Sequence, residues 1–143
     1  MKKETRRKAI ERRDKISAKE RLIYSDKIVN LIVTSEEYEK AKTIMLYKAV
    51  GSEVCLETLE KQGEKTGKIL AYPYCISKSE MAALSPNCDE AWTKGRYGIP
   101  EPLEEMSAFI KPEDIDVIIC PCAAFDDKCN LSLIHISEPT RPY

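Results

Sequence analysis

The chain has 143 residues, of which 43% are hydrophobic and 33% are charged, and its net charge is −1. The hydrophobic fraction is high enough to build a core, which excludes disorder along the whole chain. No apolar run approaches the roughly 18–20 residues that cross a bilayer, and the charged N-terminus lacks the apolar stretch of a secretory signal. We therefore expect a single domain in the cytoplasm that does not contact membranes.

Positive charge is concentrated in residues 2–21, which hold ten basic and four acidic side chains. This segment has a net charge of +6, so the rest of the chain carries −7 to reach the total of −1. A basic segment on an acidic body favours an anionic partner for that segment. The alternative is a solvated helix face without a specific partner.

Three helices are expected in the first third of the chain. Residues 2–14 are rich in Lys, Arg and Glu, which are good helix formers. Ser17 and Glu20 form a capping box, so a second helix should begin at about residue 18. Thr34 with Glu37 is a second box and predicts a short helix over 35–41. The second helix should pack through one apolar face. Leu22, Val29 and Ile32 lie near this face, beside Ile28 and Leu31.

Short apolar runs of strand length follow. The expected strands are residues 43–47, 68–72 and 116–120, with a weaker one at 81–84. A helical stretch should run to about Lys65 and be ended by Gly63 and Gly67. Pro73 and Pro121 should stop two of the strands, and the proline- and glycine-rich residues 85–102 should form a long loop.

This alternation of apolar strands and helices predicts an α/β fold in three layers, with a mostly parallel sheet and helices on both faces. The sheet should be incomplete at the C-terminus. In such sheets ligands bind beyond the carboxyl ends of the strands. Those ends are residues 47–53, 73–75 and 121–126.

Six cysteines are present, including the pair Cys120 and Cys122. Without a secretory signal we expect them to be reduced thiols. The CxC spacing could suggest a metal site, but no second pair has ligand spacing, and the only histidine is His135. We favour small buried apolar residues over metal ligands and expect no metal ligand among residues 1–143.

Four segments in order carry a resemblance to a known family. The first holds Lys2, Arg6 and residues 16–21 (ISAKER), and the second is residues 47–54 (YKAVGSEV). The third is residues 67–73 (GKILAYP), followed by Met81. The fourth begins with residues 97–102 (YGIPEP) and continues through residues 116–121 (DVIICP) to Phe125 and Asp126. Together these segments resemble the 5-formyltetrahydrofolate cyclo-ligases over residues 2–130.

The resemblance implies ATP-dependent cyclisation of 5-formyltetrahydrofolate to 5,10-methenyltetrahydrofolate, with ADP and phosphate released. It implies ATP and Mg²⁺ as cofactors, with ATP bound by Lys2 and Arg6. It implies substrate contacts from Lys48, Glu53 and Tyr97. Cys120-Pro-Cys122 departs from the Pro-Gly usual in the family, which affects the loop before Phe125. We expect a monomer that acts on small molecules and not on nucleic acid.

Residues 131–141 (LSLIHISEPTR) resemble something other than a protein. They read as the in-frame translation of a transposase adapter used to prepare sequencing libraries. The family would continue after Asn130 with Arg-Leu-Gly, a glycine-rich phosphate-binding stretch and Tyr-Tyr-Asp. We therefore expect residues 1–130 to be part of one cyclo-ligase domain and residues 131–143 to be non-native. We expect the 143-residue chain itself to be inactive and poorly folded.

Other functions remain open from the residues alone. The basic N-terminal helix could bind nucleic acid through phosphate contacts, although residues 2–21 contain no aromatic side chain to stack on bases. A related α/β sheet also occurs in proteins that handle sugar phosphates or acyl-CoA. A folate- or nucleotide-binding protein without ligase activity is a third possibility.

Overall fold

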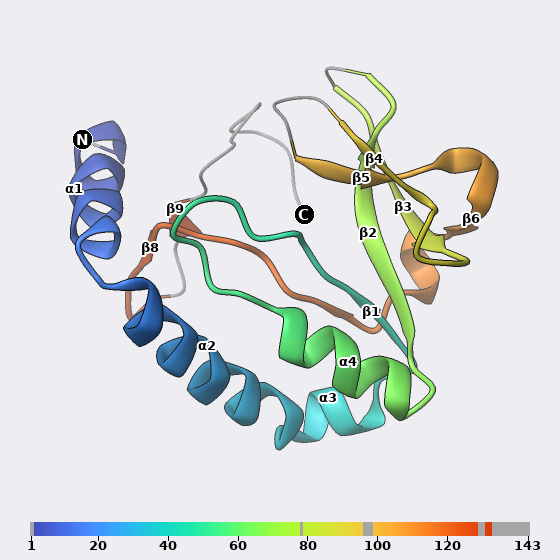
Figure 1. Cartoon of the computed structure of the whole chain (residues 1–143), viewed down its shortest axis with the longest axis horizontal. Coiled ribbons are helices and arrows are strands. Elements are labelled where there is room, and N and C mark those ends of the chain that lie inside the picture. Colours follow the sequence, from blue (N-terminus) through green and yellow to red (C-terminus); the bar gives the residue numbers. More distant parts are fainter. Residues whose placement is uncertain (1, 78, 96–98, 129–130, 133–143) are drawn as a thin grey trace.

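The computed structural model describes residues 2–77, 79–95, 99–128 and 131–132. Its four helices include 13- and 16-residue helices at the N-terminus (Figure 1). The helices are α1 (Lys2–Asp14), α2 (Ala18–Val33), α3 (Glu36–Lys40) and α4 (Glu57–Lys65). The strands are β1 (Thr43–Met45), β2 (Ile69–Cys75), β3 (Met81–Pro86), β4 (Trp92–Lys94), β5 (Pro100–Pro102), β6 (Ser107–Ile110), β7 (Val117–Ile118), β8 (Ala124–Phe125) and β9 (Leu131–Ser132). Two 3-10 turns, η2 (Glu104–Met106) and η3 (Pro112–Asp114), flank β6.

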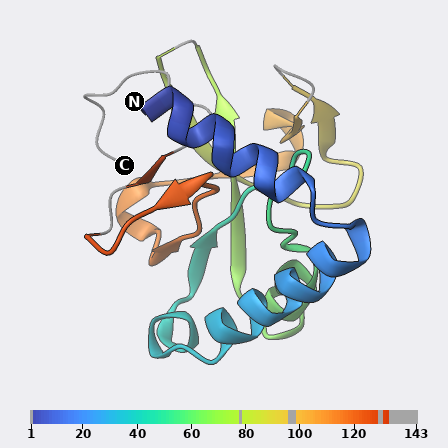
Figure 2. The same cartoon turned by 90° about the vertical axis from the view of Figure 1, so that its left-hand side faces the viewer.

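The main sheet has five strands in the order β6-β3-β2-β1-β7. Its centre is parallel, because β1 pairs with both β2 and β7 in that sense. Strands β3 and β6 extend the sheet as antiparallel neighbours. The predicted α/β class is confirmed. Helices α2 and α4 lie together on one side of the sheet (Figures 1 and 2), and a helical layer on the other face stays a prediction.

Strand β2 runs through Pro73, where the sequence predicted an end. Pro73 sits opposite Ala83 of β3. The carbonyl of Ala71 accepts from Leu46 on the β1 side, so the alternation of backbone groups turns the Pro73 nitrogen toward β1 as well. Met45 is the last residue of β1 that pairs with β2. Because Pro73 has no N–H, it cannot continue the β1–β2 ladder, whereas its position opposite Ala83 lets β2 go on beside β3 to Cys75.

Strand β7 is an edge strand and not the buried strand expected over 116–120. The Ile118 side chain is 48% exposed. Asp116, just before the strand, fixes its position, since its carboxylate accepts from the backbone N–H of Lys42 (2.8 Å) and Thr43 (3.1 Å). The hydrogen bond from Thr43 has the largest effect, that from Lys42 the next largest, and both lower the pKa of Asp116.

The caps of α2 and α3 correct one expectation. Ser17 caps α2 as predicted by accepting from the Glu20 N–H. Thr34, however, ends α2, and its hydroxyl donates to the carbonyl of Asn30 (2.8 Å). Ser35 is the N-cap of α3 and accepts from the Tyr38 N–H. The prediction missed this by one residue, because both residues have a hydroxyl that can cap.

The core lies between α2, α4 and the centre of the sheet. Its fully buried side chains are Val29, Ile44, Leu46, Leu59 and Leu84. Of the apolar α2 face that was predicted, Val29 is buried and Ile32 packs against the core. The other three members, Leu22, Ile28 and Leu31, are exposed. The α2 helix therefore contacts the core through its middle and C-terminal part.

Of the two glycines expected to end α4, only Gly67 lies beyond the helix. Gly67 has φ +78° just past the helix, a conformation that suits glycine. Gly63 lies inside α4 and is buried against Leu70, so it does not end the helix.

The segment 85–102 is more ordered than the predicted loop. Strand β3 extends to Pro86, and β4 pairs with β5 in an antiparallel hairpin. Two prolines begin and end β5, so proline content obscured this strand. No helix in the described part of the chain is both long and apolar enough to cross a membrane.

Candidate active site at the carboxyl end of strand β1

The candidate site is built on the segment that follows β1. Tyr47 is buried, and its hydroxyl donates to the carbonyl of Val54 (2.9 Å). Between them the chain turns at Gly51, whose φ of +61° favours glycine. Glu53 closes this turn by accepting from the Val50 N–H (2.7 Å). The turn therefore holds a carboxylate at the carboxyl end of a parallel strand.

Glu53 is only 8% exposed. Burial raises the pKa of the Tyr47 hydroxyl, and the nearby negative charge of Glu53 raises it further. Tyr47 is therefore a neutral hydrogen-bond donor at physiological pH. One carboxylate oxygen of Glu53 is used by Val50, and a ligand N–H can bind the other.

A cleft of about 460 Å³ lies between α2 and this segment. The α2 helix contributes Arg21, Leu22 and Ser25 to its wall, and Pro100 of β5 also borders it. From the segment after β1, the lining includes Tyr47, Lys48, Gly51, Glu53 and Cys55. The predicted substrate residues Lys48 and Glu53 thus line the same cleft.

A second cleft of about 510 Å³ lies on the other side of Lys48. Lys48 and Glu60 line both clefts. Tyr72 of β2 and Trp92 of β4 line only the second one. The pair Lys48 and Glu60 therefore lies where the two clefts adjoin.

Lys48 is held by one carboxylate and two rings. Its ammonium lies 2.8 Å from Glu60 and 4.5 Å from the centre of the Trp92 ring. The Tyr72 ring is 5.2 Å away and meets Trp92 edge to face at 4.7 Å. Glu60 also accepts from the Tyr72 hydroxyl, and burial followed by this bond raises the pKa of Tyr72. Trp92 packs in this cluster, as the sequence favoured.

Helix α1 is attached to the same turn. The Arg13 guanidinium donates to the Ser52 hydroxyl (2.8 Å) and to the carbonyl of Cys122 (3.4 Å). Ser52, in turn, donates to Asp14. The end of α1 is thus joined both to the residue before Glu53 and to the loop after β7.

The two predicted ATP-binding residues begin the same helix. Lys2 is the first residue of α1, and its side chain lies outside the described part. Arg6 follows one turn later and is half-buried, as are Ile10 and Arg13 on the same face. This face lies against the body of the protein, and α1 passes over the β8 region (Figure 2).

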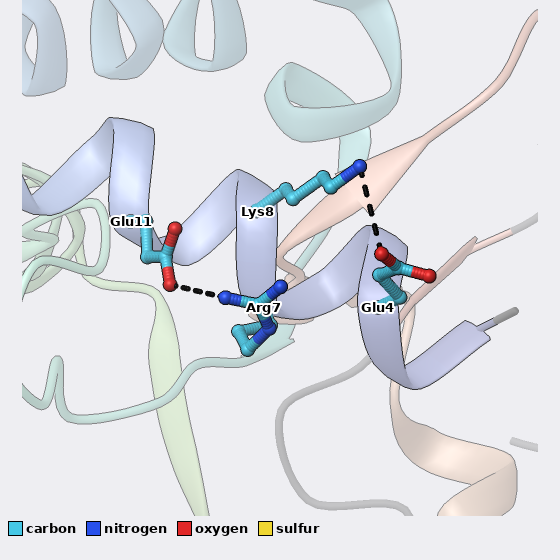
Figure 3. Close-up of polar contacts among 4 residues, drawn as sticks. All are labelled: Glu4, Arg7, Lys8 and Glu11. Carbon is cyan, nitrogen blue, oxygen red and sulfur yellow. Dashed lines mark hydrogen bonds and ion pairs between the residues drawn. The ribbon is translucent and has the colours of Figure 1, made fainter.

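The opposite face of α1 carries paired charges. Arg7 contacts Glu11 at 2.7 Å and Lys8 contacts Glu4 at 3.7 Å, one turn apart along the helix (Figure 3). These acids offset part of the positive charge that a nucleic-acid backbone would need. The contacts weaken the nucleic-acid alternative for this face.

Tyr97, the third predicted substrate residue, lies outside the described residues. Sequence reasoning missed Arg21 and Glu60 as lining residues. Both are ordinary helix positions in a highly charged sequence, and only the packing of α2 and α4 places them at the cleft.

No group of three or more His, Cys, Asp or Glu side chains in the described ranges could hold a metal ion. None of the five described cysteines is fully buried, so the expectation of small buried residues is wrong for them: Cys88 and Cys120 are exposed, and Cys55, Cys75 and Cys122 are half-buried. Partial desolvation raises the pKa of the Cys120 and Cys122 thiols.

Comparison with known proteins identifies the family. The profile of the 5-formyltetrahydrofolate cyclo-ligase family matches residues 1–130. The chain belongs to this family. No protein of curated function matches the sequence.

Two solved structures are similar. The 5,10-methenyltetrahydrofolate synthetase of Aquifex aeolicus has 31% identity and a TM-score of 0.77 over 87% of this chain. The 5,10-methenyltetrahydrofolate synthetase of Mycoplasma pneumoniae, at 19% identity, shares the fold, with a TM-score of 0.71 over 93% of this chain. The match spans 62% of the Aquifex chain and 71% of the Mycoplasma chain.

Proposed function

We propose that the protein to which residues 1–130 belong converts 5-formyltetrahydrofolate to 5,10-methenyltetrahydrofolate and consumes ATP. The observation that carries this proposal is the placement of Lys48 and Glu53 in one cleft at the carboxyl end of β1, in a chain of the cyclo-ligase family. Ligands of α/β sheets bind at such strand ends.

The reaction must overcome the low reactivity of an amide. The N5-formyl carbonyl is a poor electrophile, and its oxygen is a poor leaving group. Transfer of the γ-phosphoryl group of ATP to that oxygen changes both properties. N10 then attacks the formyl carbon, and phosphate leaves with the oxygen. The protein has to align the formyl oxygen with the γ-phosphorus and stabilise charge on the phosphoryl group.

Glu53 and Lys48 are proposed to bind the folate. The buried Glu53 carboxylate suits the N–H donors of a pterin ring, because its charge strengthens those hydrogen bonds. Lys48 is held by Glu60 and by Trp92 at the boundary of the cleft. An ammonium fixed in this way can donate to a ligand oxygen with little further loss of side-chain freedom.

Lys2 and Arg6 are proposed to bind ATP phosphates from α1. Their spacing of four residues places them one turn apart. A guanidinium offers two parallel donors to phosphate oxygens, and an ammonium adds a mobile charge. The attachment of α1 through Arg13 and Ser52 brings this helix to the turn that carries Glu53.

Magnesium would be carried with the nucleotide. Mg²⁺ often binds through substrate phosphates, waters and only one or two carboxylates. That mode fits the described residues, which contain no cluster of three ligating side chains. The bound ion would neutralise phosphate charge. We propose a monomer in the cytoplasm that acts on small molecules, and analytical ultracentrifugation of the purified protein tests its oligomeric state.

The test is turnover by the protein expressed from the source gene. We expect the near-ultraviolet absorption of the methenyl product to appear only when ATP and 5-formyltetrahydrofolate are both present. ADP should form in equal amount. Binding of folate without ADP formation would instead support the binding-only alternative. Absence of both binding and turnover would reject the proposal.

A further inference from the structure

The cleft beside α2 contains a buried donor that lacks a partner. Arg21 is half-buried, and its Nε is buried without a hydrogen-bond acceptor in the described structure. Another nitrogen of the same guanidinium donates to the carbonyl of Gly51 at 3.4 Å. A buried N–H of a charged group is strongly unfavourable when unpaired. Arg21 lines the cleft, and an acceptor bound there would satisfy this donor once the guanidinium turns toward it.

Glu53 is the obvious partner but does not serve as one. Both side chains are described, and no ion pair joins Arg21 to Glu53. Each side chain instead contacts the backbone of the same turn: Glu53 accepts from the N–H of Val50, and Arg21 donates to the carbonyl of Gly51. The cleft therefore offers a carboxylate acceptor and a guanidinium donor that remain available to one ligand.

The charges around the cleft restrict that ligand. Three carboxylates line it, from Glu53, Glu57 and Glu60, against two cations, Arg21 and Lys48. A polyanion such as a triphosphate would meet an excess of negative charge. A neutral ring whose edge carries N–H donors beside a carbonyl oxygen complements a carboxylate next to a guanidinium better.

We propose that Arg21 is a specificity-determining residue that donates a hydrogen bond to the 4-oxo group of the pterin ring. Glu53 accepts from the N3–H and the 2-amino group along the same edge of the ring. This inference rests on the proposed function, since it names which edge of the folate faces α2. It accounts for a buried guanidinium Nε–H that has no partner although a carboxylate lines the same cleft.

The experiment compares two ligands and three variants by titration calorimetry on the protein expressed from the source gene. The ligands are 5-formyltetrahydrofolate and its analogue with a 4-amino group in place of the 4-oxo group. The variants are Arg21→Met, Arg21→Lys and, as a control, Lys19→Met, which removes an exposed charge from the same helix. Thermal unfolding of each variant verifies that it folds.

The unaltered protein should bind the 4-oxo ligand about 10- to 100-fold more tightly than the 4-amino analogue, the range for a hydrogen bond to a charged group. Arg21→Met should weaken binding of the 4-oxo ligand and leave binding of the analogue unchanged. Part of the preference should remain, because a 4-amino ring has no N3–H from which Glu53 can accept. Arg21→Lys should restore part of the lost preference, and Lys19→Met should leave the preference unchanged.

An equal loss for both ligands in Arg21→Met would overturn the proposal, because it would indicate a general effect of charge or folding. A preference of unreduced size in Arg21→Met would overturn it as well. In either case, binding of 5-formyltetrahydrofolate by the unaltered protein would leave the proposed function standing. Failure of the unaltered protein to bind either ligand would overturn both.

Discussion

Arg13 donates a 2.8 Å hydrogen bond to Ser52, which lies 39 residues later in the chain. Ser52 is 6% exposed, and its hydroxyl donates a hydrogen bond to Asp14. This contact ties the last turn of α1 to the residue before Glu53. The helix proposed to bind ATP and the turn proposed to bind folate are therefore joined directly.

Ser52→Ala should weaken the attachment of α1 to the turn that carries Glu53. It leaves the Arg13 Nε without its acceptor and should lower the free energy of unfolding by about 1–3 kcal/mol. Amide hydrogen exchange in α1 should accelerate, and ATP should bind several-fold more weakly while folate binding changes less. Ser79→Ala, at an exposed serine, is the matched control. Unchanged exchange in α1 would show that this contact does not hold the helix.

Lys48 and Glu60 should be energetically coupled. Their side chains are 29% and 14% exposed, and the ammonium lies 2.8 Å from the carboxylate. A double-mutant cycle with Lys48→Met and Glu60→Gln should give about 1–2 kcal/mol in unfolding experiments. The exposed pair Lys40 and Glu36, at 2.6 Å, is the control and should give about 0.5 kcal/mol or less. Equal coupling in the two pairs would contradict the importance of burial at Lys48.

Asp116→Asn should lower stability in a pH-dependent way. Hydrogen bonds from the Thr43 and Lys42 backbone lower the pKa of Asp116 below its ordinary value of 3.8. The resulting stabilisation is present above pH 3.8 and is lost as the pH falls through the lower pKa of the folded state. The melting temperatures of the two proteins should therefore differ at pH 7 and converge in acid. A difference that persists unchanged in strong acid would contradict this origin.

Much of the fold followed from local patterns in the sequence. The capping box at Ser17 and the apolar run at residues 43–47 predicted α2 and β1, because each depends on neighbouring residues. Strand β5 was missed because prolines at both of its ends are typical of a loop. Only its pairing with β4 in three dimensions shows that it is a strand. Pro73 was misread because it ends only the pairing with β1, and β2 continues beside β3 to Cys75.

The site was predicted only in part. Glu53 and Lys48 were found because they follow a strand and match a family segment. Arg21 and Glu60 were not, since their role depends on how α2 and α4 pack beside that strand. A buried donor without an acceptor is visible only in three dimensions.

The identity of residues 131–143 remains a prediction. The family match ends at residue 130, and the adapter-like sequence begins at Leu131. The structure pairs Leu131 and Ser132 with β8, which does not test their origin. A long sequencing read of the source gene should show a different continuation after codon 130. The same codons in the intact gene would refute the prediction.

The central claim is tested most directly by turnover in Glu53→Gln. This change keeps the size of the side chain and removes the charge that is proposed to bind the pterin N–H groups. With the protein expressed from the source gene, 5-formyltetrahydrofolate and ATP, we expect methenyl product from the unaltered protein and a loss in kcat/KM of about 10- to 100-fold in the variant. Equal rates in the two proteins, or no methenyl product from the unaltered one, would contradict the account.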